Sequence, residues 1–386
     1  MKKIRILVVD DSAVVRRLLT DLLNQDPELE VVGMAGNGEQ AVSRVQQLTP
    51  DILTLDVEMP VLDGLGTLRV LRKSHPRLPI IMFSTLTEKG SAATMDALAL
   101  GASDYVNKPA NVGSVIEGME KIRHDLIPKI KALCHRVLTP TTPPPRPAPT
   151  VAPLPVARPS GTAGGAEILA IGVSTGGPNA LAELMPAIGR GLPVPILIVQ
   201  HMPPLFTRLL AERIATVSGA ICREAVDGET LKPGEVLIAP GGKHLEVEKY
   251  RDGVRTRLQE EPPENSCRPA VDVLFRSVAK VYGGKSLAVV LTGMGQDGLK
   301  GCEHIRAAGG QILVQDEASS VVWGMPGAVS NAGLAEKALP LPELAVEIRK
   351  RVSAPKRPSD AGSAVPALSA TSAVPFPVTP QRPPTL

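Results

Sequence analysis

Short apolar runs alternate with amphipathic stretches along most of this chain, and that rhythm limits its fold more than any other feature. In the first part of the chain, the apolar runs predict strands at residues 4–9, 29–34, 52–55, 80–83 and 104–106. The stretches between them predict helices at residues 13–24, 38–48, 64–73, 91–100 and 112–133. Nearly continuous apolar strands that alternate with helices are typical of a parallel sheet covered on both faces.

A second set of such repeats follows in the later part of the chain. Strands are expected at residues 168–173, 196–200, 236–239, 287–292 and 311–314. Helices are expected at residues 179–188, 205–217, 270–281, 296–308 and 341–352. Between these repeats the pattern predicts a hairpin that turns at Arg251-Asp252-Gly253. We therefore expect a doubly wound, mostly parallel α/β domain with a β-hairpin insertion.

Two segments differ in composition from the rest. Residues 140–160 hold nine prolines, and residues 353–386 are rich in Pro, Ala, Ser and Thr. Neither segment has enough apolar surface to offset the entropy lost on ordering it, so they are interpreted as a semi-stiff linker and a disordered tail. The predicted domains are residues 1–125, with a last helix extending to about 138, and residues 166–352, with the linker at 139–165 between them.

Charge and composition argue against several classes of protein. A net charge of +3 and an aromatic content of 2% do not predict a nucleic-acid partner. The cysteines lack the spacing of zinc ligands or of a redox pair, and we expect reduced thiols at Cys134, Cys222, Cys267 and Cys302. No apolar run approaches the ~18 residues of a membrane helix, and the first run is unlike a secretory signal. We expect a cytoplasmic protein without membrane insertion.

Acidic residues stand where two strands of the first block end. Asp10 and Asp11 end the first strand, and Asp56 ends the third. Ligands of such sheets bind at the carboxyl ends of the strands, where these side chains should gather. A cluster of carboxylates suits Mg²⁺, which favours oxygen ligands and phosphate.

Two further polar residues end the remaining strands of this edge. Ser84 ends the fourth strand, and Lys108 ends the fifth. A hydroxyl and an ammonium facing the carboxylates are what an aspartyl phosphate requires, because its oxygens need neutralisation. The alternative is that each residue only forms a turn or caps a helix, which Asp and Ser often do.

A glycine-flanked serine follows the first strand of the second block. Residues Gly172-Val173-Ser174-Thr175-Gly176 fit the pattern G-x-S-x-G, the nucleophile elbow of α/β-hydrolases. The same residues also fit a tight strand-to-helix turn that binds an anion. The five residues alone leave both interpretations open.

A serine nucleophile needs a base and an orienting acid. Among the histidines, His201 directly follows the strand at 196–200 and should share an edge with Ser174. Asp297 and Asp316 both follow later strands, and the glycine-rich loop around Asp297 also offers backbone N–H groups for an oxyanion hole. The pattern leaves the choice of acid open. The order Ser, His, Asp differs from the Ser, Asp, His order of α/β-hydrolases.

The first block resembles the receiver domain of bacterial response regulators, which has a flavodoxin-like fold. The stretches that carry the resemblance are Val8-Val9-Asp10-Asp11-Ser12, Leu55-Asp56-Val57-Glu58-Met59-Pro60, Asp63-Gly64, Ser84 and Lys108-Pro109. The resemblance implies that Asp56 accepts a phosphoryl group from a partner histidine kinase. It also implies that Asp10 and Asp11 hold Mg²⁺ together with Asp56. Ser84 and Lys108 would sense the phosphate.

The second block resembles the catalytic domain of the chemotaxis protein-glutamate methylesterase (CheB-type) family. The matching stretches are Ile171–Pro178, Gln200-His201-Met202-Pro203, Ala239–His244, Arg268–Phe275, Leu291–Gly298 and Gln315–Pro326. The resemblance implies that Ser174 is the nucleophile, His201 the general base and acid, and Asp297 the orienting acid. It favours Asp297 over Asp316 and suggests the backbone N–H groups of Thr175 and Met294 as oxyanion donors.

The same resemblance implies a substrate and a use. The substrate would be γ-methyl glutamate on cytoplasmic helices of chemoreceptors, giving glutamate and methanol, and certain receptor glutamines would be deamidated. No cofactor is expected for the ester chemistry. The sequence departs from the family in Val173, where Ala is commoner, and in its long proline-rich linker.

In this family the unphosphorylated receiver covers the active site, and a long linker weakens that expectation because it lowers the effective concentration of the two domains. We expect a monomer. Two alternatives are a non-enzymatic module that signals by docking and a transcription factor, although the second block shows no helix-turn-helix pattern.

Overall fold

The computed structural model describes residues 2–85, 87–108, 115–134 and 165–352. The predicted tail, the predicted linker up to residue 164, Pro109 and residues 135–138 of the predicted helical extension lie outside the described residues. The extension beyond residue 125 is confirmed up to Leu133, where α5 (Val115–Leu133) ends. All described residues belong to one compact unit, Met1–Ala354.

The first block is a five-stranded parallel sheet in the order β2-β1-β3-β4-β5, which is the flavodoxin-like order. The strands are β1 (Ile4–Val9), β2 (Leu29–Ala35), β3 (Ile52–Asp56), β4 (Ile80–Ser84) and β5 (Asp104–Asn107). The predicted strands are confirmed to within one residue at each end. Strands β3 and β4 end on the predicted site residues Asp56 and Ser84 themselves.

Five helices accompany this sheet: α1 (Ala13–Asn24), α2 (Gly38–Leu48), α3 (Gly64–Ser74), α4 (Glu88–Ala99) and α5 (Val115–Leu133). The first four begin after a side chain that accepts a backbone N–H bond, namely Ser12, Asn37, Asp63 and Thr87. Because Thr87 caps α4, this helix begins at Glu88 and not at residue 91 as predicted. The start of α5 was predicted at residue 112, and residues 109–114 are not described.

The second block is a seven-stranded sheet in the order β14-β13-β12-β6-β7-β9-β8, and every neighbouring pair is parallel. Its strands are β6 (Ile168–Val173), β7 (Ile196–Gln200), β8 (Ile221–Glu224), β9 (Glu235–Ile238), β12 (Ser286–Val290), β13 (Gln311–Gln315) and β14 (Lys337–Leu339). The predicted hairpin is confirmed as the antiparallel pair β10 (His244–Tyr250) and β11 (Gly253–Gln259). The fold class expected from the sequence is therefore confirmed.

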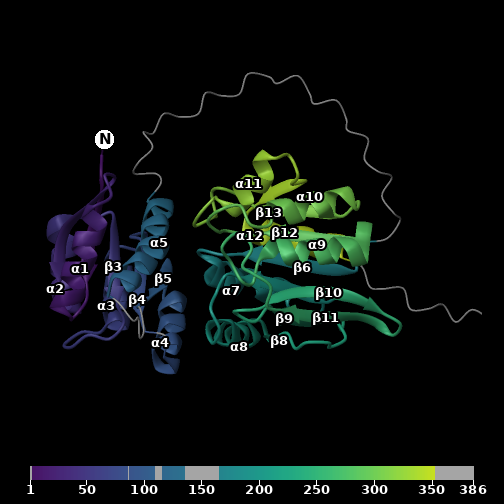
Figure 1. Cartoon of the computed structure of the whole chain (residues 1–386), viewed down its shortest axis with the longest axis horizontal. Helices are drawn as coiled ribbons and strands as arrows, with labels where there is room; N and C mark the ends of the chain where they lie inside the picture. Colours follow the sequence, from purple (N-terminus) through teal and green to yellow (C-terminus); the bar gives the residue numbers. More distant parts are fainter. Residues whose placement is uncertain (1, 86, 109–114, 135–164, 353–386) are drawn as a thin grey trace, which may run out of the picture. The chain divides into compact units, whose positions relative to one another are not determined.

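Helices cover both faces of this second sheet (Figure 1). Their bounds are α7 (Gly177–Ile188), α8 (Phe206–Ser218), α9 (Val271–Tyr282), α10 (Leu299–Ala307), α11 (Met325–Asn331) and α12 (Leu341–Arg351), with a short 3-10 helix at Gly283–Lys285. Alternate residues of β6 face different helices. Leu169 and Ile171 pack with α7, α8 and α12, whereas Ile168 and Ala170 pack with α9 and α10.

The predicted element bounds were wrong at two places near the later strand ends. The helix expected at 296–308 begins only at Leu299, because Gly298 adopts a left-handed conformation (φ 97°). The strand expected at 287–292 ends at Val290, since the N–H of Thr292 donates to the side chain of Gln315 and not to the backbone of the neighbouring strand β13. Residues 291–298 therefore form a loop at the carboxyl edge of the sheet.

A glycine in β6 allows α9 to begin close to the strand. A Cβ atom built on Gly172 would lie 2.3 Å from Cγ1 of Val271, the first residue of α9. Only a glycine permits this approach without a shift of the helix. The first glycine of the G-x-S-x-G pattern thus places the start of α9 beside the serine turn.

We predict that Gly172→Ala lowers the melting temperature of the protein by an amount equivalent to about 1–3 kcal/mol, because the added methyl group overpacks against Val271. The double variant Gly172→Ala/Val271→Ala removes the clashing atoms. Its loss of stability should therefore be smaller than the sum of the losses in the two single variants. Additive losses, measured by thermal unfolding, would contradict this packing argument.

Candidate active site

Ser174 stands in the turn between β6 and α7, at the carboxyl edge of the sheet. Its N–H donates to the carbonyl oxygen of Thr292 (3.0 Å), and its own carbonyl accepts from Nε2 of Gln200 (2.9 Å). The left-handed residue of the turn is Gly176 (φ 78°) and not the serine. Glycine adopts this conformation without strain, so the serine is presented at the edge by its neighbour.

His201 lies at the same edge because β6 and β7 are parallel and in register. Val173 pairs with Gln200 at the end of the two strands, so Ser174 and His201 both follow directly after a paired position. The side chain of His201 is 12% exposed. No hydrogen bond joins Ser174 Oγ to the His201 ring, although the structure describes both residues. Hydrogen bonds between catalytic groups are often long in the absence of substrate.

Asp297 is the acid that contacts His201. Its Oδ2 lies 2.7 Å from Nε2 of His201, and its side chain is 3% exposed. The backbone N–H groups of Val271 and Asp272 also donate to this carboxylate, at 2.7 Å and 3.0 Å. The carboxylate of Asp316 instead accepts bonds from Ser319 in a turn after β13. The geometry therefore joins Asp297, and not Asp316, to the histidine.

The hydrogen bond to Asp297 assigns different tasks to the two ring nitrogens of His201. Because Nε2 faces the carboxylate, Nδ1 is the nitrogen left to face a reacting group. Burial lowers the pKa of His201, but the bond with Asp297 and the nearby Cys267 raise it more, so the net shift is upward. Burial raises the pKa of Asp297, while His201 lowers it to a net downward shift. The pair thus stabilises a positive imidazolium.

Two backbone N–H groups border the serine without partners of their own. Within the part of the chain that the structure describes, the N–H groups of Thr175 and Met294 make no hydrogen bond. Met294 follows Gly293, which packs against the serine, since a Cβ atom on Gly293 would lie 2.8 Å from Ser174 Cβ. Free N–H groups beside a serine are what an oxyanion hole requires.

Residues of the first block contact the serine turn. Oγ1 of Thr175 donates to Oδ2 of Asp104 in β5 (2.9 Å), and this bond is buried. Beside it, the rings of Tyr105 and Phe206 stack with their centroids 4.6 Å apart. A cavity of about 430 Å³ next to these contacts is lined by residues of both blocks, including His201. Access to His201 is therefore bordered by the receiver-like block.

The acidic cluster predicted in the first block is present. Carboxylate oxygens of Asp10, Asp11 and Asp56 lie within 4.8 Å of one another. Nζ of Lys108 lies 2.9 Å from Asp10 and 2.7 Å from Asp56. The hydroxyl of Ser84, at the same edge, donates to the carbonyl oxygen of Gly90 in α4 (3.1 Å). All five residues of the sequence prediction meet at one edge.

Burial dominates the electrostatics of this cluster. It raises the pKa of Asp56 to about 6, with a further rise from Asp10, although Lys108 acts in the opposite direction. Burial lowers the pKa of Lys108, but its two carboxylate partners outweigh this and give a net rise. One ammonium faces three carboxylates, so the cluster keeps an excess of negative charge. Such a set of oxygen donors fits a Mg²⁺ ion.

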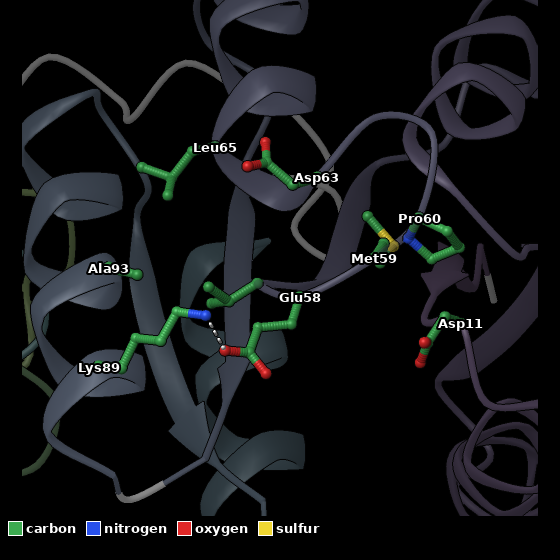
Figure 2. Close-up of a pocket in the computed structure, with 9 residues that line it drawn as sticks. Asp11, Glu58, Met59, Pro60, Asp63, Leu65, Lys89 and Ala93 are labelled. Carbon is green, nitrogen blue, oxygen red and sulfur yellow. Dashed lines mark ion pairs between the residues drawn. The ribbon is translucent and has the colours of Figure 1, made fainter.

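Figure 2 shows a groove beside the acidic cluster, with Asp11 on its wall. The groove is lined on one side by the loop after β3 and on the other by α4, and Lys89 pairs with Glu58 across it (3.7 Å). This ion pair is exposed and therefore contributes little to stability. A separate small cavity of about 150 Å³ is lined by Asp56, Ser84 and Lys108. Asp11 borders both spaces, so the acidic cluster is reached from this groove.

Two other histidines have structural surroundings. His244 is 1% exposed, and its Nδ1 accepts the N–H of Ala270 (3.2 Å). His304 lies exposed on α10. The sequence analysis missed Asn265, Cys267 and Asp272, which contact the His201–Asp297 pair. Asn265 and Cys267 lie in an irregular loop that shows no periodic pattern. Asp272 lies in the stretch Arg268–Phe275 that carries the family resemblance, which could have marked it.

These observations define a class of protein: a response regulator whose second domain is a hydrolase built on a parallel α/β sheet, with a chain order of serine, histidine and acid that differs from that of the α/β-hydrolases. A family model of the response regulator receiver domain matches residues 6–120, and one of the CheB methylesterase matches residues 169–348. The chain belongs to the protein-glutamate methylesterase/protein-glutamine glutaminase family.

Two curated relatives carry that name. The protein from Trichodesmium erythraeum is 52% identical over 354 residues, covering 91% of this chain and 100% of the relative. The protein from Nocardioides sp. is 54% identical over 360 residues, covering 93% and 98%. The crystal structure of the Thermotoga maritima CheB methylesterase catalytic domain is 41% identical and covers 48% of this chain and 99% of that chain, with a TM-score of 0.48. None of the helices in the described ranges has the length and apolar character to cross a bilayer.

We predict that Asp297→Ala lowers the melting temperature at pH 7, because two backbone N–H groups and a histidine lose a buried acceptor, a loss of about 2–4 kcal/mol. The pKa of Asp297 is lowered in the folded state, so its stabilisation is complete above the unfolded-state pKa and is lost as the pH falls through the folded value. The difference from wild type should therefore be smaller at pH 3 than at pH 7.

Asp316→Ala is the control for this experiment, since its carboxylate bonds only within its own turn. It should lower the melting temperature less than Asp297→Ala does at pH 7. An equal loss in the two variants would refute the special position of Asp297.

Proposed function

We infer that the chain hydrolyses glutamate γ-methyl esters on chemoreceptors to glutamate and methanol, and that it deamidates specific receptor glutamines. This activity serves chemotactic adaptation and is controlled by phosphorylation of the receiver. Membership of the family supports the activity. The observation that carries it is the His201–Asp297 bond of 2.7 Å at the sheet edge where Ser174 stands.

In the proposed reaction, Oγ of Ser174 attacks the ester carbonyl while Nδ1 of His201 takes the hydroxyl proton. The negative oxygen of the tetrahedral intermediate accepts hydrogen bonds from the N–H groups of Thr175 and Met294. His201 then gives its proton to the departing methoxide oxygen, which leaves as methanol, or to the amide nitrogen of a glutamine substrate, which leaves as ammonia. Water attacks the acyl-serine by the same route and releases glutamate.

Asp297 acts through His201 in this scheme. Its carboxylate fixes the proton of the neutral ring on Nε2, and it stabilises the imidazolium that forms when Nδ1 takes the second proton. The upward pKa shift of His201 and the downward shift of Asp297 both support such a pair.

We propose that Asp56 accepts the phosphoryl group, with a histidine kinase as the donor. Asp10, Asp11 and Asp56 would hold Mg²⁺, which supplies positive charge to the phosphoryl oxygens. Lys108, which already contacts two of these carboxylates, and Ser84 would contact the phosphorylated side chain, and their position at the same strand ends supports this role. The partners, a kinase and chemoreceptors, together with four free cysteines, favour action in the cytoplasm.

The contact between the two blocks supports a mechanism of control. Asp104 in β5 binds the side chain of Thr175, whose N–H is a proposed oxyanion donor. β5 ends one residue before Lys108, which contacts Asp56. A rearrangement of Lys108 on phosphorylation would therefore be transmitted through one strand to the serine turn.

We predict that Ser174→Ala lowers the rate of methanol release from methylated receptors by about a thousandfold or more, as removal of a triad member generally does. A serine-directed acyl trap should label wild type at Ser174 and should not label His201→Ala. Near wild-type turnover by Ser174→Ala would refute the nucleophile. Absent labelling of the wild type would favour the docking module considered above.

We predict that Asp56→Asn abolishes the rise in methanol release that a small-molecule phosphodonor causes in wild type, because an amide does not accept the phosphoryl group. Asp21→Asn removes the same charge from the exposed surface of α1 and should keep the full response. If full-length protein responds equally with and without Asp56, the regulatory part of the proposal is wrong.

A further inference from the structure

Helices α9 and α10 begin side by side near Asp297, and neither start is capped by its own N-cap side chain. Each is capped by a carboxylate of the other segment. Asp297, just before α10, accepts the N–H groups of Val271 and Asp272 in α9 (2.7 and 3.0 Å). Asp272, in the first turn of α9, accepts the N–H groups of Gly298 and Gly301 (3.0 and 2.6 Å). These crossed caps lock the two helix starts together.

A single amide links the two capping carboxylates. Nδ2 of Asn265 donates to Oδ1 of Asp297 (2.8 Å) and to Oδ2 of Asp272 (2.9 Å). Asn265 adopts a left-handed conformation (φ 52°), which asparagine tolerates better than most residues. The loop before α9 thus holds an asparagine in an uncommon conformation and aims its amide at both acids.

The bridge completes the hydrogen bonding of Asp297. Its Oδ2 accepts from His201 and Val271, and its Oδ1 accepts from Asn265 and the N–H of Asp272. With two donors on each oxygen, the carboxylate has one favourable orientation, and that orientation aims Oδ2 at His201. Without the amide, Oδ1 would keep one donor and would face a second buried carboxylate, that of Asp272.

We propose that Asn265 and Asp272 are positioning residues for the His201–Asp297 pair, with Asn265 bridging the two acids and Asp272 clamping the loop that carries Asp297. The inference rests on the proposed catalytic roles of Ser174, His201 and Asp297. A misplacement of about 1 Å in such a pair can lower a rate by about a hundredfold. Loss of either positioning residue should therefore lower kcat far more than it changes KM.

The two residues also have opposite electrostatic consequences when substituted. The acid limb of the kcat/KM profile reports the deprotonation of His201, the proposed base. A nearby negative charge stabilises the protonated ring and so moves this limb to higher pH. Asn265→Asp adds a negative charge and should move the limb to higher pH. Asp272→Asn removes one and should move it to lower pH, in each case by about 0.5–1 unit.

Other titratable or charged groups surround the pair and stay the same in these variants. Cys267 and Arg268 line the same cavity as His201. The remaining groups are Glu264, Arg276 and Lys300 near the carboxylates, and Asp125 and Lys129 on the far wall of the cavity. Since none of them is altered, a difference between the two variants reports the substituted charge.

The test measures methanol release from methylated receptors by full-length, phosphodonor-treated protein between about pH 5 and pH 9. Asn265→Asp and Asp272→Asn should each lower kcat about 10- to 100-fold, leave KM within about threefold, and shift the acid limb in opposite directions. Surface controls with the same charge changes, Asn331→Asp and Asp252→Asn, should resemble wild type in all three quantities.

Two results would overturn the proposal. In the first, kcat and the acid limb of the kcat/KM profile in both variants are the same as in the surface controls. In the second, kcat falls but the acid limb does not move in either variant, which indicates a merely structural role. Asn265→Gly keeps the left-handed backbone without strain and removes the side chain that carries the amide. An unchanged kcat in this variant would overturn the proposal even if another variant failed to fold.

Ser174→Ala is measured alongside these variants. If Ser174→Ala is inactive and the positioning variants behave as controls, only this inference fails, whereas an active Ser174→Ala refutes the proposed function itself.

Discussion

The parallel pairing of β6 with its neighbours β7 and β12 is the constraint on which the rest of the site depends. Parallel strands have their carboxyl ends at the same edge of the sheet. This edge therefore brings together Ser174 after β6, His201 after β7 and the loop that follows β12. Gly172 adds the start of α9 to this edge, because it leaves room for Val271. The reactive groups are thus held by the most buried part of the domain.

The two blocks use the same arrangement for different chemistry. In the receiver, carboxylates at the strand ends remain close to one another, and burial raises the pKa of Asp56, so the cluster favours added positive charge. In the second domain, a single carboxylate is saturated with hydrogen-bond donors and favours an ionised state beside a histidine. The hydrogen bond between Thr175 and Asp104, the first residue of β5, connects the serine turn to the outermost strand of the receiver sheet.

Elements that are buried on both sides could be predicted from the sequence almost to the residue. β1, β6 and β7 are continuous apolar runs, and the structure contains them with the predicted bounds. β8 and β14 were missed because they lie at the edges of the sheet and are mostly half-buried or exposed, so their residues show no apolar run. The start of α10 was misplaced because the helix is capped by Asp272, a residue from another element.

The sequence by itself determined the fold class, the two blocks and the identities of the candidate serine, histidine and receiver residues, since these depend on local periodicity and on motifs of neighbouring residues. The pattern of the residues left Asp297 and Asp316 open, the family resemblance favoured Asp297, and the tertiary structure brings Asp297 to the histidine. Only the tertiary structure assigned Nε2 of His201 to the acid and revealed the bridge through Asn265. Those facts depend on distances of about one hydrogen bond between residues far apart in the chain. No spacing along the sequence encodes such distances, because helix packing and strand order set them.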